Sequence, residues 1–233
     1  MKSITAAISI LILSVAAVEQ PDRAAAAIDH VESITEINDL HHHLPTTSSS
    51  SNRRIQSGPN AGKRMAAWRK VHNDARKKYH VEYGGSFTPI KFNMALKRDA
   101  EAWAKELVKD CNNRLPSSEF NEDGHGVNSA MRTGSRGFQS PNAVMKMWEN
   151  KLQYGYPKNG AMTQVLWSKT GHVGCADASS AIGAEKTCTA SVCFYAKAGN
   201  CAFGRFGGKG NWTQAVLYGP ACSTACPSNL ETC

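Results

Sequence analysis

The order of helical and β-favouring segments predicts an α+β fold. Amphipathic helical patterns lie between residues 64 and 152, and β-favouring runs follow residue 160. Strand and helix do not alternate in the regular rhythm of a parallel sheet with crossover helices. We therefore expect a layered α+β domain in which helices pack against a sheet.

The composition fits one folded domain with accessory segments. The chain has 233 residues, of which 41% are apolar and 20% are charged, and its formal net charge is +8. This apolar fraction is too high for a wholly disordered chain, and no apolar run after residue 18 is long enough to cross a bilayer. The composition therefore excludes a membrane channel and a fibrous protein.

Residues 1–18 are predicted to be a secretory signal peptide. Lys2 precedes an apolar run over residues 4–17, which ends in the small residues Ala16 and Ala17. The alternative, an N-terminal membrane anchor, needs about 20 apolar residues. We therefore expect a secreted, extracellular protein with no transmembrane segment, whose cysteines form disulfides. The eight candidates are Cys111, Cys175, Cys188, Cys193, Cys201, Cys222, Cys226 and Cys233.

Residues 19–62 are predicted to be a disordered, acidic and serine-rich leader. Residues 19–50 hold six acids and one base, whereas residues 51–233 hold 25 bases and 13 acids. Such a polar segment cannot bury enough apolar surface to offset the entropy lost on ordering. Within it, the histidine triplet 41–43 is either a metal-binding tract or a flexible polar one. Arg53-Arg54 is either a processing site or an ordinary charged pair.

Two helices are predicted before residue 112. The first covers residues 64–80, where apolar side chains recur every three or four residues. The second follows Asn93, which is a favourable N-cap, and ends at Cys111. Between them, Gly84-Gly85 breaks the helical pattern and residues 89–92 form an extended connector. The apolar positions of the two helices are Met65, Trp68, Val71, Ala75, Tyr79, Leu96, Ala100, Trp103, Ala104 and Leu107.

A third helix and several strands are predicted in the second half of the chain. Proline is tolerated in the first helical turn, so Ser140-Pro141 starts a helix that turns Val144, Leu152 and either Met147 or Trp148 inward. The segment before it, residues 112–140, is polar and is expected to be irregular. The predicted strands, rich in β-branched and aromatic residues, are 163–167, 172–175, 191–195 and, more weakly patterned, 212–218.

Four stretches in this order resemble motifs of the CAP superfamily, the cysteine-rich secretory, antigen 5 and pathogenesis-related-1 proteins. Residues 72–76 read HNDAR, and Trp103-Ala104 is followed by Cys111. TQVLW begins at Thr163 and is followed by VGC, and residues 193–200 read CFYAKAGN. The resemblance implies an SCP domain over residues 63–219 with a cysteine-containing tail over 220–233. It also implies a three-layer α-β-α sandwich with a central antiparallel sheet.

The resemblance further implies where the family's two histidines and two glutamates, which hold a divalent metal in some members, would lie. In this chain those four positions are Pro116, Val127, Lys151 and Ala161. Imidazoles and carboxylates ligate zinc-like ions, whereas this set offers no suitable ligand, and a lysine repels a cation. We therefore expect no metal, no cofactor and no catalytic residue. The alternative is that a shifted loop brings His125 and Glu122 into the cleft.

The family pairing of cysteines, carried over by the same resemblance, joins Cys111 to Cys175 and Cys188 to Cys193. The remaining four cysteines then pair among themselves and fasten the tail. Cys222, Cys226 and Cys233 also have the spacing of a small metal-binding knuckle, but disulfides are the favoured interpretation for an exported chain. Asn211-Trp212-Thr213 is a candidate glycosylation sequon, which is either used or unused.

The excess of basic residues in the body of the chain bears on its partners. Positive charge attracts nucleic acid, anionic lipid head groups or acidic glycans, but no aromatic-interleaved nucleic-acid motif is present, so no specific nucleic-acid binding is expected. The basic residues of the first helix have an ordinary explanation as its solvated face. They are Arg69, Lys70, Arg76, Lys77 and Lys78.

The sequence therefore predicts a secreted, non-enzymatic CAP-domain protein that acts by binding in extracellular defence, virulence or signalling. The resemblance implies a sterol or fatty acid as ligand, or an extracellular protein as partner, while the ligand-binding residues are unknown. The alternative function is a secreted metal-dependent hydrolase or protease with a re-lined cleft. No GxSxG or HExxH motif supports that alternative.

Overall fold

A computed structural model describes residues 56–57, 61–111, 124–134, 137–182, 184–230 and 233. The predicted signal peptide, most of the predicted leader, Pro116 and Glu122 lie outside the described residues. All described residues belong to one unit, Ser50–Cys233. None of the helices within these ranges is both long enough and apolar enough to cross a membrane.

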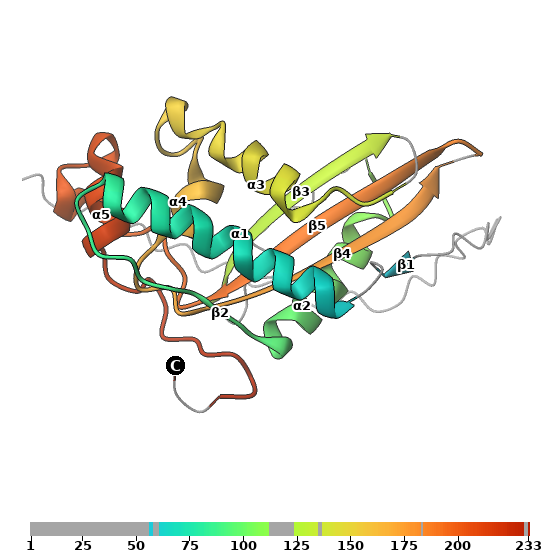
Figure 1. Cartoon of the computed structure of the whole chain (residues 1–233), viewed down its shortest axis with the longest axis horizontal. Helices are drawn as coiled ribbons and strands as arrows, with labels where there is room; N and C mark the ends of the chain where they lie inside the picture. Colours follow the sequence, from blue (N-terminus) through green and yellow to red (C-terminus); the bar gives the residue numbers. More distant parts are fainter. Residues whose placement is uncertain (1–55, 58–60, 112–123, 135–136, 183, 231–232) are drawn as a thin grey trace, which may run out of the picture. The chain divides into compact units, whose positions relative to one another are not determined.

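The sheet is built around a long antiparallel hairpin, β4 (His172–Ile182) and β5 (Lys186–Ala196), as Figure 1 shows. β3 (Gly126–Gly134) pairs antiparallel with β5, and β1 (Gln56–Ser57) pairs antiparallel with β4, giving the order β1-β4-β5-β3. β2 (Lys91–Phe92) joins β4 in parallel. The sheet is therefore mainly antiparallel, as expected.

Helices cover both faces of this sheet. The helix α2 (Met94–Leu107) packs on one face, whereas α1 (Ala61–Glu82), α3 (Pro141–Glu149) and α4 (Gly160–Leu166) pack on the other. Because successive side chains of a strand point to opposite faces, each long strand contributes to two separate cores. The α1-side core includes Val173, Cys175, Cys193 and Tyr195, and the α2-side core includes Ala176, Ala178, Val192 and Phe194. The predicted α+β class and three-layer α-β-α arrangement are confirmed.

The predicted helix starts are confirmed at two capping residues. The Asn93 side chain accepts hydrogen bonds from the amides of Ala95 and Leu96 at 2.8 and 3.2 Å. Ser140 likewise accepts from the Ala143 amide at 3.1 Å, and Pro141 occupies the first turn of α3. Further along α3, Trp148 is buried while Met147 is 39% exposed, which decides between the two alternatives for its inward face.

The glycine of the VGC motif lets α2 approach the sheet closely. A Cβ atom added at Gly174 would lie 2.2 Å from the Lys97 amide nitrogen and 2.4 Å from the Leu96 carbonyl carbon. Both are backbone atoms of the first turn of α2, so they have little freedom to move aside. Gly174 therefore sets the distance between α2 and β4.

Two predicted strands are helices. Residues 163–167 lie largely in α4, and residues 212–218 form α5 (Trp212–Tyr218). In both segments apolar side chains enter the α1-side core at helical spacing, including Met162, Val165 and Leu166 in α4 and Ala215 and Val216 in α5. Burial against that core outweighs the β preference of the valine, threonine and tryptophan residues. Short 3-10 helices, η2 (Leu152–Tyr154), η3 (Phe203–Phe206) and η4 (Lys209–Asn211), lie near these segments along the chain.

One strand was not predicted. Residues 112–140 were expected to be irregular, but Gly126–Gly134 form β3 in unbroken register with β5, from Gly126 opposite Tyr195 to Gly134 opposite Thr187. The segment contains glycine, asparagine, serine and alanine, which have weak β preference. Its pairing with β5 and the burial of Asn128 and Ala130 place it in the sheet.

The expected pairing of the first four cysteines is wrong. The disulfides are Cys111–Cys188 and Cys175–Cys193. Cys188 and Cys193 are five residues apart on β5, so they point to opposite faces and cannot join each other. Cys188 faces α2, within reach of Cys111, which lies four residues beyond the end of that helix. Cys175 and Cys193 are opposite each other in the hairpin.

The last four cysteines pair among themselves, as expected, in the disulfides Cys201–Cys222 and Cys226–Cys233. The tail that they fasten also makes backbone contacts with the domain. Cys222 donates to the Ala198 carbonyl at 2.8 Å, and the Trp167 indole donates to the Pro220 carbonyl at 2.8 Å. Further on, the side-chain nitrogen of Asn93 donates to the side-chain oxygen of Asn229 at 2.9 Å. The tail is thus packed on the domain as far as the N-terminus of α2.

Candidate functional site

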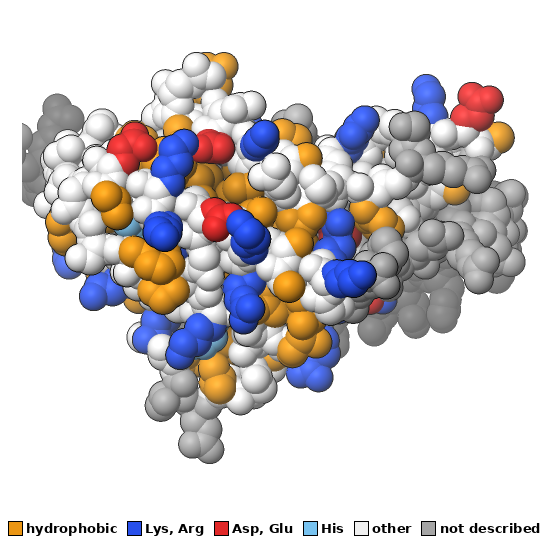
Figure 2. Space-filling model, viewed as in Figure 1, with side chains coloured by type: hydrophobic (Ala, Val, Ile, Leu, Met, Phe, Trp, Pro, Cys, Tyr) orange, Lys and Arg blue, Asp and Glu red, His pale blue; other side chains and the backbone are white. Residues whose placement is uncertain are grey.

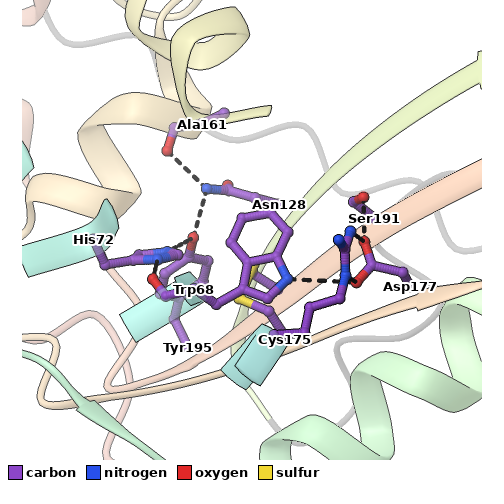
Figure 3. Close-up of a disulfide and its surroundings, with 10 residues drawn as sticks. Trp68, His72, Asn128, Ala161, Cys175, Asp177, Ser191 and Tyr195 are labelled. Atoms are coloured by element: carbon purple, nitrogen blue, oxygen red, sulfur yellow. Dashed lines mark hydrogen bonds and ion pairs between the residues drawn. A yellow bond between two sulfur atoms is a disulfide. The ribbon is translucent and has the colours of Figure 1, made fainter. Parts of the chain in front are cut away.

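A buried polar chain links α1, β5, β3 and α4 in the α1-side core (Figure 3). It begins at His72 on α1, which is fully buried. Nδ1 of His72 donates to the Trp68 carbonyl at 2.8 Å, because a carbonyl can only accept. Nε2 therefore carries no proton in the neutral ring and accepts a hydrogen bond from the Tyr195 hydroxyl at 2.9 Å.

The electrostatics of this chain keep His72 uncharged at neutral pH. Burial is the main cause that lowers the pKa of His72 from 6.5 to about 4; the hydrogen bond to Trp68 opposes this shift, and the Arg76 charge adds to it. Burial also raises the pKa of Tyr195, so its phenol keeps its proton. Neither ring nitrogen of His72 is free to act as a base or as a metal ligand.

The polar chain continues from Tyr195 to Asn128 on β3. The Asn128 amide donates one hydrogen bond to the Tyr195 oxygen at 3.0 Å and another to the Ala161 carbonyl at 2.7 Å. Ala161 thus takes part through its backbone. Neither Tyr195 nor Asn128 was among the residues predicted to form a site. The available signal was a polar residue at an inward position of a strand, but β3 itself had not been predicted.

A second buried cluster surrounds Asp177 on β4, beside the Cys175–Cys193 disulfide (Figure 3). Two nitrogens of Arg64 bond its two oxygens, Ser191 donates to Oδ1, and the Trp68 indole donates to Oδ2 at 3.4 Å. Asp177 is 4% exposed. A buried carboxylate with this many donors is held as an ion pair, so the cluster fastens the start of α1 to the sheet.

Two further polar side chains of α1, Arg76 of the HNDAR motif and His80 beyond it, donate to backbone carbonyls. Arg76 is fully buried, contrary to its expected place on the solvated face, and donates to four carbonyl oxygens at 2.7–3.2 Å. These belong to Thr88, Val165, Trp167 and Thr170. His80 Nε2 donates to the Leu166 carbonyl at 2.7 Å. Arg76 and His80 therefore fix the end of α4 and the loop after it.

One group of possible metal ligands occurs among the described residues. His72, Cys175 and Cys193 place ligand-type atoms within 4.8 Å of one another. The two sulfurs are bonded to each other, so neither is a thiolate, which is the form that binds metal. With both imidazole nitrogens hydrogen-bonded as well, this group does not fit a metal ion.

The structure does not bring the family's expected metal-ligand positions together. Val127 packs on the α2-side core, whereas Ala161 packs on the α1-side core, so the sheet separates the two. Lys151 is exposed at the start of η2, and Pro116 lies outside the described residues. Hydrocarbon side chains and an ammonium group do not fit a divalent cation.

His125, the alternative ligand, is buried under the C-terminal tail. Its ring packs edge-on against Phe194 with centroids 6.4 Å apart, and Nε2 donates to the Cys226 carbonyl at 3.4 Å. Phe194 belongs to the α2-side core, so His125 lies across the sheet from His72 and Ala161. Its proposed partner Glu122 is outside the described residues.

Basic side chains are scattered over the face of the unit seen in Figure 2. On α1, Lys70 pairs with Asp74 at 2.6 Å and Lys78 pairs with Glu149 at 2.9 Å. Both pairs are largely exposed, and such pairs contribute little to stability. This part of the basic surface agrees with the expected solvated helix face.

These observations agree with the comparison with known families. Residues 69–195 match the model of the cysteine-rich secretory protein family, CAP, and this stretch is more than half of the 233 residues. The chain belongs to the CAP family.

Among curated proteins, the chain is similar to two wasp allergens. It is 31% identical to venom allergen 5.02 of Vespa crabro over 99 residues, which are 39% of this chain and 48% of that protein. It is 31% identical to venom allergen 5 of Vespula vidua over 129 residues, 46% of this chain and 61% of that protein. The chain thus spans less than two thirds of either relative.

Solved structures with a similar arrangement include two proteins of parasitic worms. The hookworm platelet inhibitor is 19% identical, with a TM-score of 0.43 over 60% of this chain and 71% of that one. The venom allergen-like protein 4 of Schistosoma mansoni is 17% identical, with a TM-score of 0.39 over 58% and 88%. No functional conclusion rests on these two likenesses.

Proposed function

We propose that this chain is an exported CAP-domain protein that acts by binding an extracellular ligand and carries no catalytic centre. The observation that carries this proposal is that the buried imidazole of His72 is used on both nitrogens by Trp68 and Tyr195. In addition, three of the positions where the family resemblance implies metal ligands hold Val127, Lys151 and Ala161. A catalytic metal ion needs a free imidazole, carboxylate or thiolate, and these residues supply none.

Export is supported by three independent features. The first 18 residues have the pattern of a signal peptide, and all eight cysteines are paired in four disulfides. Disulfides persist in oxidising compartments. The similar wasp proteins are named as venom allergens. We infer that residues 1–18 are removed and that the body of the chain works outside the cell.

Asn211 is proposed to carry an N-linked glycan. It is exposed at the end of η4, immediately before α5, so the side chain is accessible to a transferase. Expression in a eukaryotic secretory host followed by a glycosidase should lower the apparent mass of the wild type and leave Asn211→Gln unchanged. An unchanged wild-type mass would overturn this assignment.

Zinc binding and peptide hydrolysis test whether the protein is a metal-dependent hydrolase. We expect isothermal titration of the secreted protein with zinc chloride to show no stoichiometric binding, with zinc-free carbonic anhydrase as the positive control. A general peptide substrate should not be cleaved at a rate that responds to EDTA. One zinc ion bound per chain, together with hydrolysis lost on chelation, would instead establish the metal-dependent hydrolase.

The ligand class that follows from the family resemblance is a sterol or a fatty acid. Radiolabelled cholesterol and palmitate are incubated separately with the protein, and the protein is recovered by gel filtration. We expect one of the two labels to be retained and displaced by its unlabelled form. Retention of neither would remove lipid as the ligand and leave an extracellular protein as the partner.

A further inference from the structure

A surface with exposed aromatic and basic side chains lies on η2, the loop after it, η3 and η4. We call it the aromatic–basic surface and define it by Lys151, Tyr154, Tyr156, Lys158, Arg205 and Lys209. All are exposed except Tyr156, which is half-buried. We propose that this surface binds a sulfated polysaccharide outside the cell.

Contacts between rings and ammonium groups hold the surface together. Nζ of Lys209 lies 5.8 Å from the centre of the Tyr156 ring, which brings η4 beside the loop after η2. The Tyr156 ring lies 4.1 Å from that of Phe203 on η3, the same 3-10 helix that carries Arg205. Residues from two separate stretches of the chain therefore lie close together at Tyr156.

The part of the surface on and near η2 also combines tyrosine and lysine side chains. Nζ of Lys158 lies 5.9 Å from the centre of the Tyr154 ring, and Tyr154 is 61% exposed. The Tyr154 amide donates to the Lys151 carbonyl at 3.1 Å, so these two residues lie within one turn. Lys151 thus adds a fourth positive charge to those of Lys158, Arg205 and Lys209.

Negative charge is scarce around these four cations. Between residues 150 and 230 the acids are Asp177, which is buried and bound by Arg64, and Glu185, near the turn that joins β4 to β5. That turn is at the other end of the hairpin from η3 (Figure 1).

The neighbouring helices add two acids. Glu149 on α3 is engaged by Lys78 and Tyr79, and Glu82 lies on the last turn of α1. Within the described part of the chain, none of the four cations has a carboxylate within 4 Å. Their charge is therefore available to an external anion.

The chemistry of the surface matches a charged sugar polymer. The cations are spread along two stretches of chain, which suits an anionic polymer better than a single small anion. Lysine and arginine form charge-assisted hydrogen bonds with sulfate oxygens, and tyrosine offers a large amphipathic ring for the sugar. An anionic bilayer would be favoured by protruding apolar side chains, but the neighbouring phenylalanines, Phe203 and Phe206, are buried and half-buried.

This inference goes beyond the proposed function and depends on it only for the extracellular compartment. It is tested with heparin, by measuring the dissociation constant and the salt concentration needed for elution from a heparin column. The test variant is Lys158→Gln/Arg205→Gln/Lys209→Gln. The control variant, Lys63→Gln/Arg132→Gln/Lys186→Gln, removes the same charge from exposed residues near the other end of the sheet. All proteins come from one host, so that the state of Asn211 is constant.

We expect the test variant to bind heparin about tenfold more weakly than the wild type, because three ionic contacts are lost, and the control variant to change little. Tyr154→Ala keeps every charge and should weaken binding about threefold. Equal losses in the two triple variants, or no heparin binding by the wild type, would overturn the proposal. Binding to phosphatidylserine vesicles in place of heparin would also overturn it. The cholesterol and palmitate assays contain no sulfated polysaccharide, so their outcome is read separately from that of the heparin assay.

Discussion

The Tyr195 hydroxyl donates a hydrogen bond to Nε2 of His72 across 2.9 Å, and this contact joins the central strand β5 to α1 inside the core. The same hydroxyl oxygen accepts from Asn128, so one phenol satisfies two buried polar side chains. Because all three side chains are 5% exposed or less, water cannot replace any lost partner. A motif residue that could be mistaken for a catalytic histidine is therefore part of the scaffold.

Removing the Tyr195 hydroxyl should destabilise the protein without changing its shape. We expect Tyr195→Phe to lower the free energy of unfolding by about 1–3 kcal/mol, because His72 loses its donor and Asn128 loses an acceptor. Urea denaturation followed by tryptophan fluorescence measures the change. Tyr218→Phe is the matched control, since Tyr218 is 57% exposed. Equal stability of the two variants would show that the buried hydrogen bonds of Tyr195 contribute nothing to the free energy of unfolding.

Stability should fall as the solution is acidified below about pH 6.5. The pKa of His72 is lowered to about 4 in the folded state, mainly by burial, so between these values the unfolded chain binds a proton that the folded chain does not. The stabilisation is present above pH 6.5 and is lost as the pH falls toward 4, by roughly 3 kcal/mol from this residue. His80 and His172, whose pKa values are also lowered chiefly by burial, act in the same direction.

Urea denaturation at pH 7.5, 5.5 and 4.5 measures this dependence. His72→Gln cannot take up the proton and should show a weaker loss of stability over the same range, although it is less stable at pH 7.5. A wild type that gains stability on acidification would contradict the assignment of a neutral, buried His72.

Gly174 should not tolerate even one added methyl group. We expect Gly174→Ala to cost roughly 1–3 kcal/mol, because its Cβ would overlap the backbone of Lys97 and Leu96 and push α2 away from the sheet. Gly171→Ala is the control, since a Cβ there meets nothing within 4 Å. Thermal unfolding of the two variants compares them, and a similar melting temperature would contradict the close approach.

Disulfide connectivity should follow the two faces of the sheet. Peptide mapping under non-reducing conditions is expected to recover Cys111 joined to Cys188, and Cys175 joined to Cys193. Replacing Cys111 and Cys188 together by serine should cost about 2–4 kcal/mol, and more than replacing Cys226 and Cys233. The reason is loop length, 77 residues against 7. A peptide that joins Cys111 to Cys175 would contradict this map.

Local patterns in the sequence were sufficient to predict three helices. The positions Trp68, Ala75 and Tyr79 on α1 and Leu96, Ala100 and Trp103 on α2 are all buried, as their spacing predicts. Asn93 and Ser140 mark helix starts because their side chains bond nearby amides, which is a local interaction. Such features depend on residues within one or two turns, so they are visible without the fold.

The motifs located the family, but they did not predict how the expected metal-ligand positions are arranged. Sequence reasoning placed Val127 and Ala161 in one cleft, whereas the side-chain alternation of β3 turns Val127 toward α2 and Asn128 toward α4. That outcome depends on the register of β3 with β5. Register is a pairing between distant segments, and no periodicity within residues 112–140 encodes it.

The sequence by itself determined the family and the order of the first helices. Tertiary structure alone decided that 163–166 and 212–218 are helical, which cysteines pair, and that His72 and Arg76 are buried. The physical reason is that helix spacing and capping are local, whereas burial and sheet register depend on contacts between distant segments. A polar side chain such as His72 becomes scaffold only when Tyr195, 123 residues away in the sequence, meets it in the core.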